Sequence, residues 1–238
     1  MSFKFWRLLV VVVLSVGLGI VAFSATVDEV IGYYSSADTA SCKPPVQAFI
    51  NTINATYKTG PSVGYVNRFT TSNDSYWDAR DLGFVCAHGN KWIFALSNGT
   101  VYLDNLTDGW GETDMEWAIL YSCLVVASPI EDASNWHKPW IVETTDVFDC
   151  LHIVNGFRTS AYVTPAVNVT TNYCSRLNSG GYVLDSWFDA IYAYGYYWTA
   201  YDQGCSMYFG TCENDTVSSF AADPAQTQTT DFHCMYMD

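Results

Sequence analysis

The chain contains the stretch Leu82-Gly83-Phe84-Val85-Cys86-Ala87-His88-Gly89 and, further on, the stretch Trp117-Ala118-Ile119-Leu120-Tyr121-Ser122-Cys123. Each has the length and apolar density of a buried β-strand, and each ends in a residue type that can do chemistry. Catalytic residues of open α/β sheets lie at the carboxyl ends of strands. If the two strands are neighbours, His88 and Cys123 meet at one edge of the sheet as a base and a nucleophile.

The segments before His88 alternate between strand and helix patterns. Glu29–Tyr34 predicts a first strand, Pro44-Pro45 opens a helix with apolar residues at helical spacing, and Val63–Phe69 predicts a weaker second strand. Such alternation favours a mostly parallel sheet with covering helices. The fold class expected from the residues is therefore α/β.

A hairpin signal follows His88. The apolar runs Lys91–Leu96 and Thr100–Leu103 flank Ser97-Asn98-Gly99, and Asn-Gly between two such runs is typical of a β-hairpin. We therefore expect a β-hairpin insertion between the strand that precedes His88 and the strand that precedes Cys123.

The second half of the chain is less regular. Leu151–Val154 predicts a strand that Asn155-Gly156 stops, and residues 159–181 predict a loop. Apolar residues from Leu184 to Ile191 lie on one helical face, and Ser206–Phe209 predicts a last strand. For the aromatic run Tyr192–Tyr201, core packing is the favoured interpretation, and an exposed face for a partner or carbohydrate is the alternative.

The two ends of the chain differ from the middle. Residues 1–25 have a basic start, the apolar core Leu8–Phe23 and small residues, as in a secretory signal, with an uncleaved membrane anchor as the alternative. Residues 26–213 form one expected domain, and residues 214–238 an expected polar tail. The chain is thus predicted to be secreted and extracellular, with membrane contact only if the N-terminal segment is retained.

The composition limits the partners. The chain has 10 basic and 24 acidic residues, a net charge of −14, which repels nucleic acid. Export would make six Asn-x-Ser/Thr triplets candidate glycosylation sites. These begin at Asn54, Asn73, Asn98, Asn105, Asn168 and Asn214.

The chain has eight cysteines, an even number that usually indicates disulfides in an exported protein. A specific alternative to a free Cys123 is a bond to Cys86, which lies two residues before His88 and so points to the same side of its strand. The disulfide candidates are Cys42, Cys86, Cys150, Cys174, Cys205, Cys212 and Cys234.

The apolar strand before His88-Gly89 and the later strand before Ser122-Cys123 resemble the caspase, legumain and gingipain group of cysteine peptidases, although that group usually has Ala where this chain has Ser122. The chain is more closely similar to a family of exported proteins on this fold for which no activity is established. Five further segments carry that second resemblance: Trp110-Gly111, Glu116-Trp117, Leu151-His152, Gly156-Phe157 and the helix segment 187–190.

The resemblance implies a three-layer α/β/α caspase-like sandwich and acyl transfer to a thiol. Cys123 would attack a peptide carbonyl, His88 would carry protons, and the amides of Gly89 and Cys123 would bind the oxyanion. Glu116 and Trp117 are candidate contacts to a protein or peptide substrate. The alternative is a non-catalytic, disulfide-stapled, glycosylated structural protein of a surface or filament, capable of self-assembly.

No cofactor is expected, because four scattered histidines without paired cysteines give no zinc motif. His152 in an apolar run is expected to be a core or hydrogen-bonded histidine. Calcium is the one metal that the sequence offers, although Leu106 and Met115 stand where ligands belong. Its candidate ligands are Asp104, Asp108, Glu112 and Asp114.

Overall fold

The computed structural model describes residues 27–70, 76–106, 109–141, 147–219, 221 and 231–238. The expected signal segment lies outside these residues. Among the helices of the described part, none has both the length and the apolar character needed to cross a bilayer.

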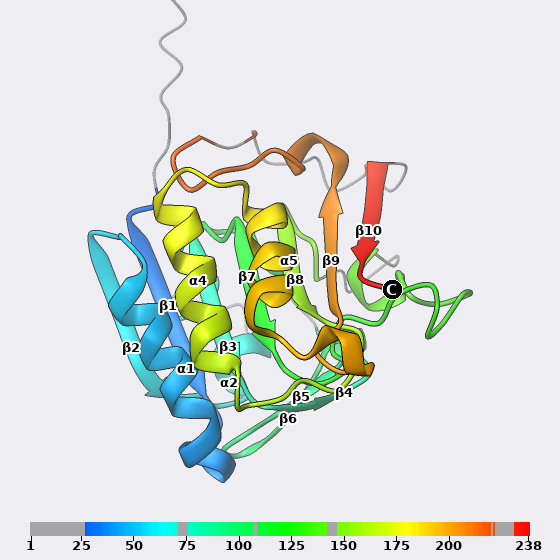
Figure 1. Cartoon of the computed structure of the whole chain (residues 1–238), viewed down its shortest axis with the longest axis horizontal. Coiled ribbons are helices and arrows are strands. Elements are labelled where there is room, and N and C mark those ends of the chain that lie inside the picture. Colours follow the sequence, from blue (N-terminus) through cyan, green and yellow to red (C-terminus); the bar gives the residue numbers. More distant parts are fainter. Residues whose placement is uncertain (1–26, 71–75, 107–108, 142–146, 220, 222–230) are drawn as a thin grey trace, which may run out of the picture.

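A seven-stranded sheet forms the centre of the fold, in the order β10-β9-β8-β7-β3-β1-β2 (Figure 1). The five strands from β8 to β2 run parallel, whereas β9 and β10 are antiparallel to their neighbours. The expected α/β class with a mostly parallel sheet is confirmed. The strands are β1 Glu29–Tyr34, β2 Tyr57–Val63, β3 Leu82–Cys86, β7 Trp117–Tyr121, β8 Ile153–Phe157, β9 Gly204–Phe209 and β10 Phe232–Tyr236.

The two strands that decide the fold are direct neighbours. β3 and β7 pair in parallel with Leu82 opposite Trp117 and Cys86 opposite Tyr121, and every residue of both strands is buried. Because the strands end level with each other, the segments that follow them emerge at the same edge of the sheet.

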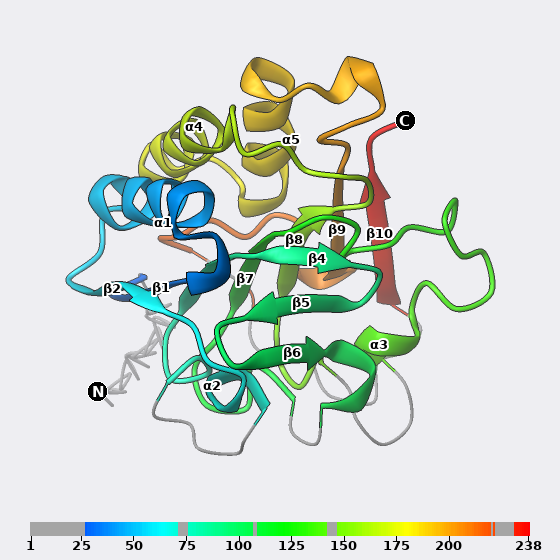
Figure 2. The same ribbon diagram turned by 90° about the horizontal axis from the view of Figure 1, so that it is seen from below.

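The two faces of the sheet are covered differently (Figure 2). The long helices α1 (Thr39–Thr52), α4 (Ala166–Asn178) and α5 (Val183–Tyr194) pack side by side on one face. On the other side lie the short helices α2 (Asn67–Thr70) and α3 (Lys138–Ile141), together with a small second sheet.

The second sheet contains the predicted hairpin. β5 (Ile93–Leu96) and β6 (Gly99–Tyr102) are antiparallel, with Leu96 opposite Gly99 across the turn, so the hairpin insertion is confirmed. The turn is anchored by Asn98, whose Oδ1 accepts the amide of Val66 at 2.8 Å. The third strand, β4 (His88–Asn90), pairs with β5 and so holds the backbone of His88.

Two boundaries in the first half differ from expectation. The first helix begins at Thr39 instead of Pro44, because the carboxylate of Asp38 accepts the amide of Ser41 and caps the helix there. The second strand is Tyr57–Val63 instead of Val63–Phe69, because the preceding residues pair with β1.

Asn155-Gly156 does not stop β8, which contradicts the sequence interpretation. The Asn155 side chain is buried, donates to the Tyr173 hydroxyl at 3.2 Å and accepts from the Ser206 hydroxyl at 2.6 Å. At Gly156 a Cβ would overlap Val126 and lie 3.2 Å from the Leu120 carbonyl oxygen. These two residues therefore serve close packing inside the sheet.

The later segments also differ in part. Helix α4 occupies most of residues 159–181, where a loop was expected, whereas α5 confirms the helix predicted around Leu184–Ile191. The segment 214–238, expected to be a polar tail, carries the edge strand β10, which pairs with β9.

Candidate functional site

The segments after β3 and β7 touch at the carboxyl edge of the sheet. A Cβ at Gly89 would lie 2.7 Å from the carbonyl oxygen of Cys123 and closer still to the Ser122 hydroxyl. The Ser122 hydroxyl donates to the carbonyl of Ala87 at 2.9 Å. Only a glycine leaves enough space at position 89 for the His88 segment to lie directly against the Cys123 segment.

Cys123 is partly exposed and faces the loop after β8. Its Sγ lies 3.3 Å from the amide nitrogen of Ala161, which donates to it, and 3.7 Å from the carbonyl oxygen of the same residue. The following residue, Leu124, has a φ of 57° and donates its amide to Thr159. An amide that donates to sulfur supports the negative charge that a nucleophilic cysteine carries.

His88 is oriented by a residue that the sequence analysis missed. Its Nε2 lies 3.3 Å from Oδ2 of Asp38, and the imidazole is 66% exposed. Asp38 lies beyond the carboxyl end of β1, the other neighbour of β3, and its Oδ1 caps α1. The sequence feature that indicates this contact is a carboxylate that follows the strand next to β3 in the parallel sheet. Between His88 and Cys123 the structure shows no hydrogen bond in its described residues.

The thiol beside Cys86 is that of Cys42 on α1. Burial, and then the neighbouring Cys42, raise the pKa of Cys86 well above its ordinary value. All eight cysteines are thiols in the structure, so a bond between Cys86 and Cys123, like the other disulfides expected from the sequence, stays a prediction.

The residues expected to contact substrate lie elsewhere. Trp117 is fully buried at the first position of β7, and its indole Nε1 donates to Asp215 Oδ2 at 3.2 Å. The length of β7, roughly 13 Å, separates this position and the preceding Glu116 from the end of the strand before Cys123. Neither residue is therefore placed to line the Cys123 site.

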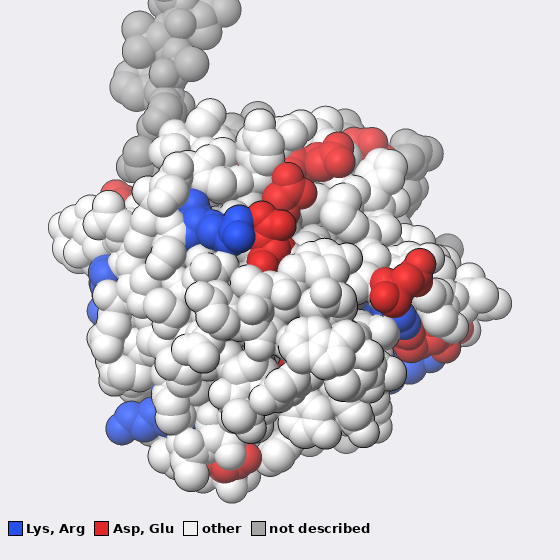
Figure 3. Space-filling model, viewed as in Figure 1, with Lys and Arg blue, Asp and Glu red and all other residues white. Residues whose placement is uncertain are grey.

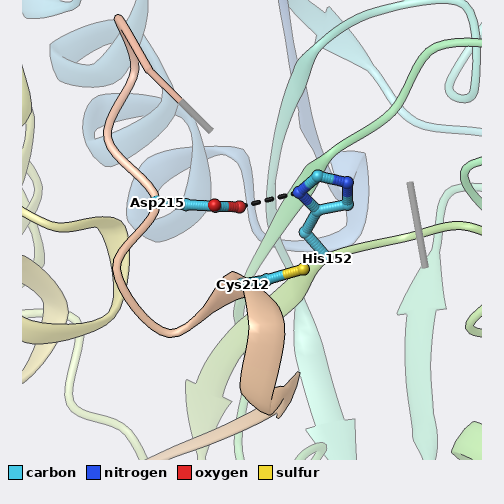
Figure 4. A group of neighbouring side chains, drawn as sticks. All are labelled: His152, Cys212 and Asp215. Atoms are coloured by element: carbon cyan, nitrogen blue, oxygen red, sulfur yellow. Dashed lines mark hydrogen bonds and ion pairs between the residues drawn. The ribbon is translucent and has the colours of Figure 1, made fainter. Parts of the chain in front are cut away.

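At that opposite edge lies a buried group formed by His152, Cys212 and Asp215 (Figure 4). The imidazole Nδ1 of His152 is 2.7 Å from Asp215 Oδ2, and Asp215 Oδ1 accepts the amide of Ala221 at 2.8 Å. The three side chains have metal-binding chemistry, with ligand atoms within 4.8 Å of one another. Two ligands of one zinc ion lie about 3.4 Å apart, however. The 2.7 Å contact is a direct hydrogen bond, which confirms the expectation of a hydrogen-bonded histidine.

The candidate calcium ligands are not brought together. Asp114 lies beside Asp81 and Glu116, with carboxylate oxygens within 4.8 Å of one another. Asp104 and Glu112 are exposed and outside that group, and Asp108 lies outside the described residues. Burial, followed by the charge of Asp81, raises the pKa of Asp114 to about 6.

Four of the candidate glycosylation asparagines are exposed: Asn54, Asn98, Asn168 and Asn214. Asn168 lies within helix α4 instead of a loop. Asn73 and the side chain of Asn105 lie outside the described residues. Glycosylation itself stays a prediction.

The aromatic run begins in the last turn of α5 and is largely exposed, so the favoured interpretation of core packing is wrong except at Tyr197, which is partly buried against the core. Tyr192, Tyr194, Trp198 and Tyr201 are between 40% and 64% exposed. Figure 3 shows few charged side chains around the lower end of α5, where the run begins. We use the term aromatic platform for the group Tyr162, Tyr192, Tyr196, Tyr197, Trp198 and Tyr201.

The aromatic platform borders Cys123. Tyr162 follows Ala161, the residue that contacts Cys123 Sγ, and its ring packs against those of Tyr196 and Tyr201 at centroid distances of 5.6 and 4.7 Å. The buried carboxylate of Asp202 accepts the amides of Tyr162 at 2.6 Å and Tyr196 at 2.9 Å. Cys123 and the exposed rings are thus joined through one short loop.

Replacing Asp215 with alanine is expected to destabilise the fold by about 3–5 kcal/mol, because it removes the acceptor of the buried Trp117 indole, of the partly buried Ala221 amide and of the His152 imidazole. Urea unfolding measures the loss. The matched control is Asp189→Ala, which breaks an exposed ion pair with Arg176 and is expected to cost about 1 kcal/mol or less. Equal losses in the two variants would contradict the role of Asp215.

The raised pKa of Asp114 predicts a pH-dependent stability. The folded state favours the protonated carboxyl, so this contribution is present below the unfolded pKa of 3.8 and is lost as the pH rises through about 6. The variant Asp114→Asn has no carboxyl group to ionise, so its stability does not fall in this way as the pH rises. Calorimetry should show a higher Tm for the variant than for the wild type at pH 7 and equal values at pH 3.5. A difference independent of pH would contradict the assignment.

The sequence was also compared with known proteins and families. Among curated proteins, none matches the chain. A family model described as a domain of unknown function, DUF6345, matches residues 34–227. This range includes both β3 and β7 and the segments that carry His88 and Cys123. The chain therefore belongs to the DUF6345 family.

Proposed function

We propose that the protein is an exported cysteine peptidase-like hydrolase that cleaves peptide bonds with Cys123 as nucleophile and His88 as general acid and base. The observation that carries the proposal is the packing of Gly89 against Ser122-Cys123 at the ends of two neighbouring parallel strands. A nucleophile, a histidine and two backbone amides then gather at one solvent-accessible edge.

The chemistry follows from these groups. Cys123 transfers its thiol proton to His88 as Sγ attacks the peptide carbonyl, and the amides of Gly89 and Cys123 donate to the oxyanion that forms. His88 protonates the leaving amine, and afterwards takes a proton from the water that hydrolyses the thioester. Asp38 is a positioning residue, since its carboxylate contacts the imidazole Nε2 at 3.3 Å.

The arrangement of the sheet supports a caspase-like sandwich as the fold behind this chemistry. One layer consists of α1, α4 and α5. In the proposed sandwich, the short helices α2 and α3 and the hairpin sheet take the place of the opposite helical layer. The hairpin follows His88 directly, so it forms a wall beside the proposed site.

The alternative is a non-catalytic extracellular structural protein on the same fold. The exposed aromatic platform favours this alternative as well, because such a surface suits a protein partner. The two functions differ in Cys123, which must be a reactive thiol in an enzyme.

Cys123→Ala should abolish hydrolysis of a fluorescently quenched casein, and His88→Ala should lower it by roughly 10²–10⁴-fold. The matched control is His233→Ala, since His233 is an exposed histidine whose Nε2 lies 3.2 Å from Asp231, and it should leave the rate unchanged. Iodoacetamide labelling across a pH series, read by mass spectrometry, should show rapid modification of Cys123 that His88→Ala slows.

Two outcomes would contradict the peptidase proposal. One is a Cys123 that labels no faster in the wild type than in His88→Ala. The other is recovery of Cys123 from the native protein in a disulfide-linked peptide. Either would favour the structural alternative.

The aromatic platform is proposed to bind side chains of the substrate beside the cleaved bond. Trp198→Ala should raise KM about 3- to 10-fold with kcat unchanged, because an aromatic contact contributes about 0.5–1.5 kcal/mol. The control is Tyr57→Ala at the start of β2, where the ring is 62% exposed against 64% for Trp198. Equal KM changes in the two variants would exclude a specific role for the platform.

A further inference from the structure

Two cysteines face each other at the edge of the sheet. Cys205 lies on β9 and Cys234 on β10, and their Sγ atoms are 3.4 Å apart. In the strand register Cys234 lies opposite Met207, two residues from Cys205. Residues two apart on a strand share a face, so the two thiols are diagonal neighbours on the same side of the antiparallel pair.

We propose that Cys205 and Cys234 form a disulfide that fastens the edge strand β10 to the sheet. A disulfide has a sulfur–sulfur distance of about 2.05 Å, so the two sulfurs need to approach by about 1.4 Å. Rotation about the Cα–Cβ bonds of diagonal neighbours moves the sulfurs by distances of this order. The proposal does not depend on the proposed peptidase function.

The exposure of the two thiols sets the order of oxidation. Cys234 is partly exposed, whereas Cys205 is fully buried, and burial raises the pKa of Cys205 above its ordinary value. A small disulfide such as oxidised glutathione therefore meets Cys234 first. The Cys234 thiolate attacks one glutathione sulfur, forms a mixed disulfide and releases one glutathione thiolate.

The second step closes the bond. Cys205 loses its proton as its sulfur attacks Cys234 Sγ in the mixed disulfide, and the second glutathione leaves as a thiolate. Two protein thiols are oxidised to one disulfide, and one oxidised glutathione is reduced to two thiols. No other reactant is needed.

The position of the bond gives it a physical role. β10 is an edge strand that pairs with β9 alone in the central sheet. Its end is held by two hydrogen bonds of Met237, whose amide donates to Gly204 at 3.0 Å and whose carbonyl accepts Arg158 Nε at 2.6 Å. A bond between residues 205 and 234 closes the whole connection between the two strands, which restricts the unfolded chain.

The test is disulfide mapping of the full chain after equilibration with oxidised glutathione. The protein is alkylated with iodoacetamide, digested without reductant and analysed by mass spectrometry. The expected result is a peptide pair joined through Cys205 and Cys234. Recovery of both residues in alkylated form, or of either joined to a different cysteine, would overturn the proposal.

Thermal unfolding with and without dithiothreitol provides a second measurement. Reduction should lower the Tm of the oxidised wild type by on the order of 10 °C. In Cys234→Ser, dithiothreitol should no longer cause this decrease in Tm. Cys234 is partly exposed, so this variant keeps the core intact. The control is Cys174→Ser, which changes a buried cysteine on α4 and should keep the full response. An unchanged response in Cys234→Ser would also overturn the proposal.

Discussion

The candidate site depends on one constraint, the parallel pairing of β3 with β7 in a register that ends both strands at the same level. The pairing alone brings the two following segments to one edge. The absence of a side chain at Gly89 then allows them to touch, because any Cβ there would collide with Ser122. The hydrogen bond from the Ser122 hydroxyl to Ala87 joins the two segments directly, so residue 122 has a structural task that alanine could not perform.

The opposite end of β7 is held by different chemistry. Asp215 accepts the indole of Trp117 and contacts the imidazole of His152, so the starts of β7 and β8 are tied to the loop after β9. Buried polar groups are hydrogen-bonded in stable folds. These hydrogen bonds can form only when the starts of β7 and β8 and the loop after β9 take this one arrangement. With both ends of β7 fixed, the position of Cys123 follows from the scaffold.

The sequence predicts the parts that depend on local pattern. The first strand, the neighbouring strands β3 and β7, the hairpin and helix α5 all have clear periodicity or turn chemistry. Helix α4 was missed because its residues 166–178 are rich in Val, Thr and Asn, which have low helix propensity. Its helical state follows from tertiary burial of Val169, Tyr173 and Leu177, whose spacing was visible in the sequence. The contact of Asp38 with His88 depends on strand order, which a linear pattern does not contain.

Asp202 holds the aromatic platform and the loop beside Cys123 in one arrangement. Burying a carboxylate is costly unless it is hydrogen-bonded, and burial raises the pKa of Asp202. The amides of Tyr162 and Tyr196 offset that cost, and the amide of Asp202 itself donates to Ser160. Because the intervening Ala161 donates to Cys123 Sγ, the same loop conformation satisfies the buried carboxylate, orients the rings and contacts the sulfur. A rearrangement of the platform would therefore require the Asp202 hydrogen bonds to break, which ties the arrangement of the exposed rings to the geometry around the thiol.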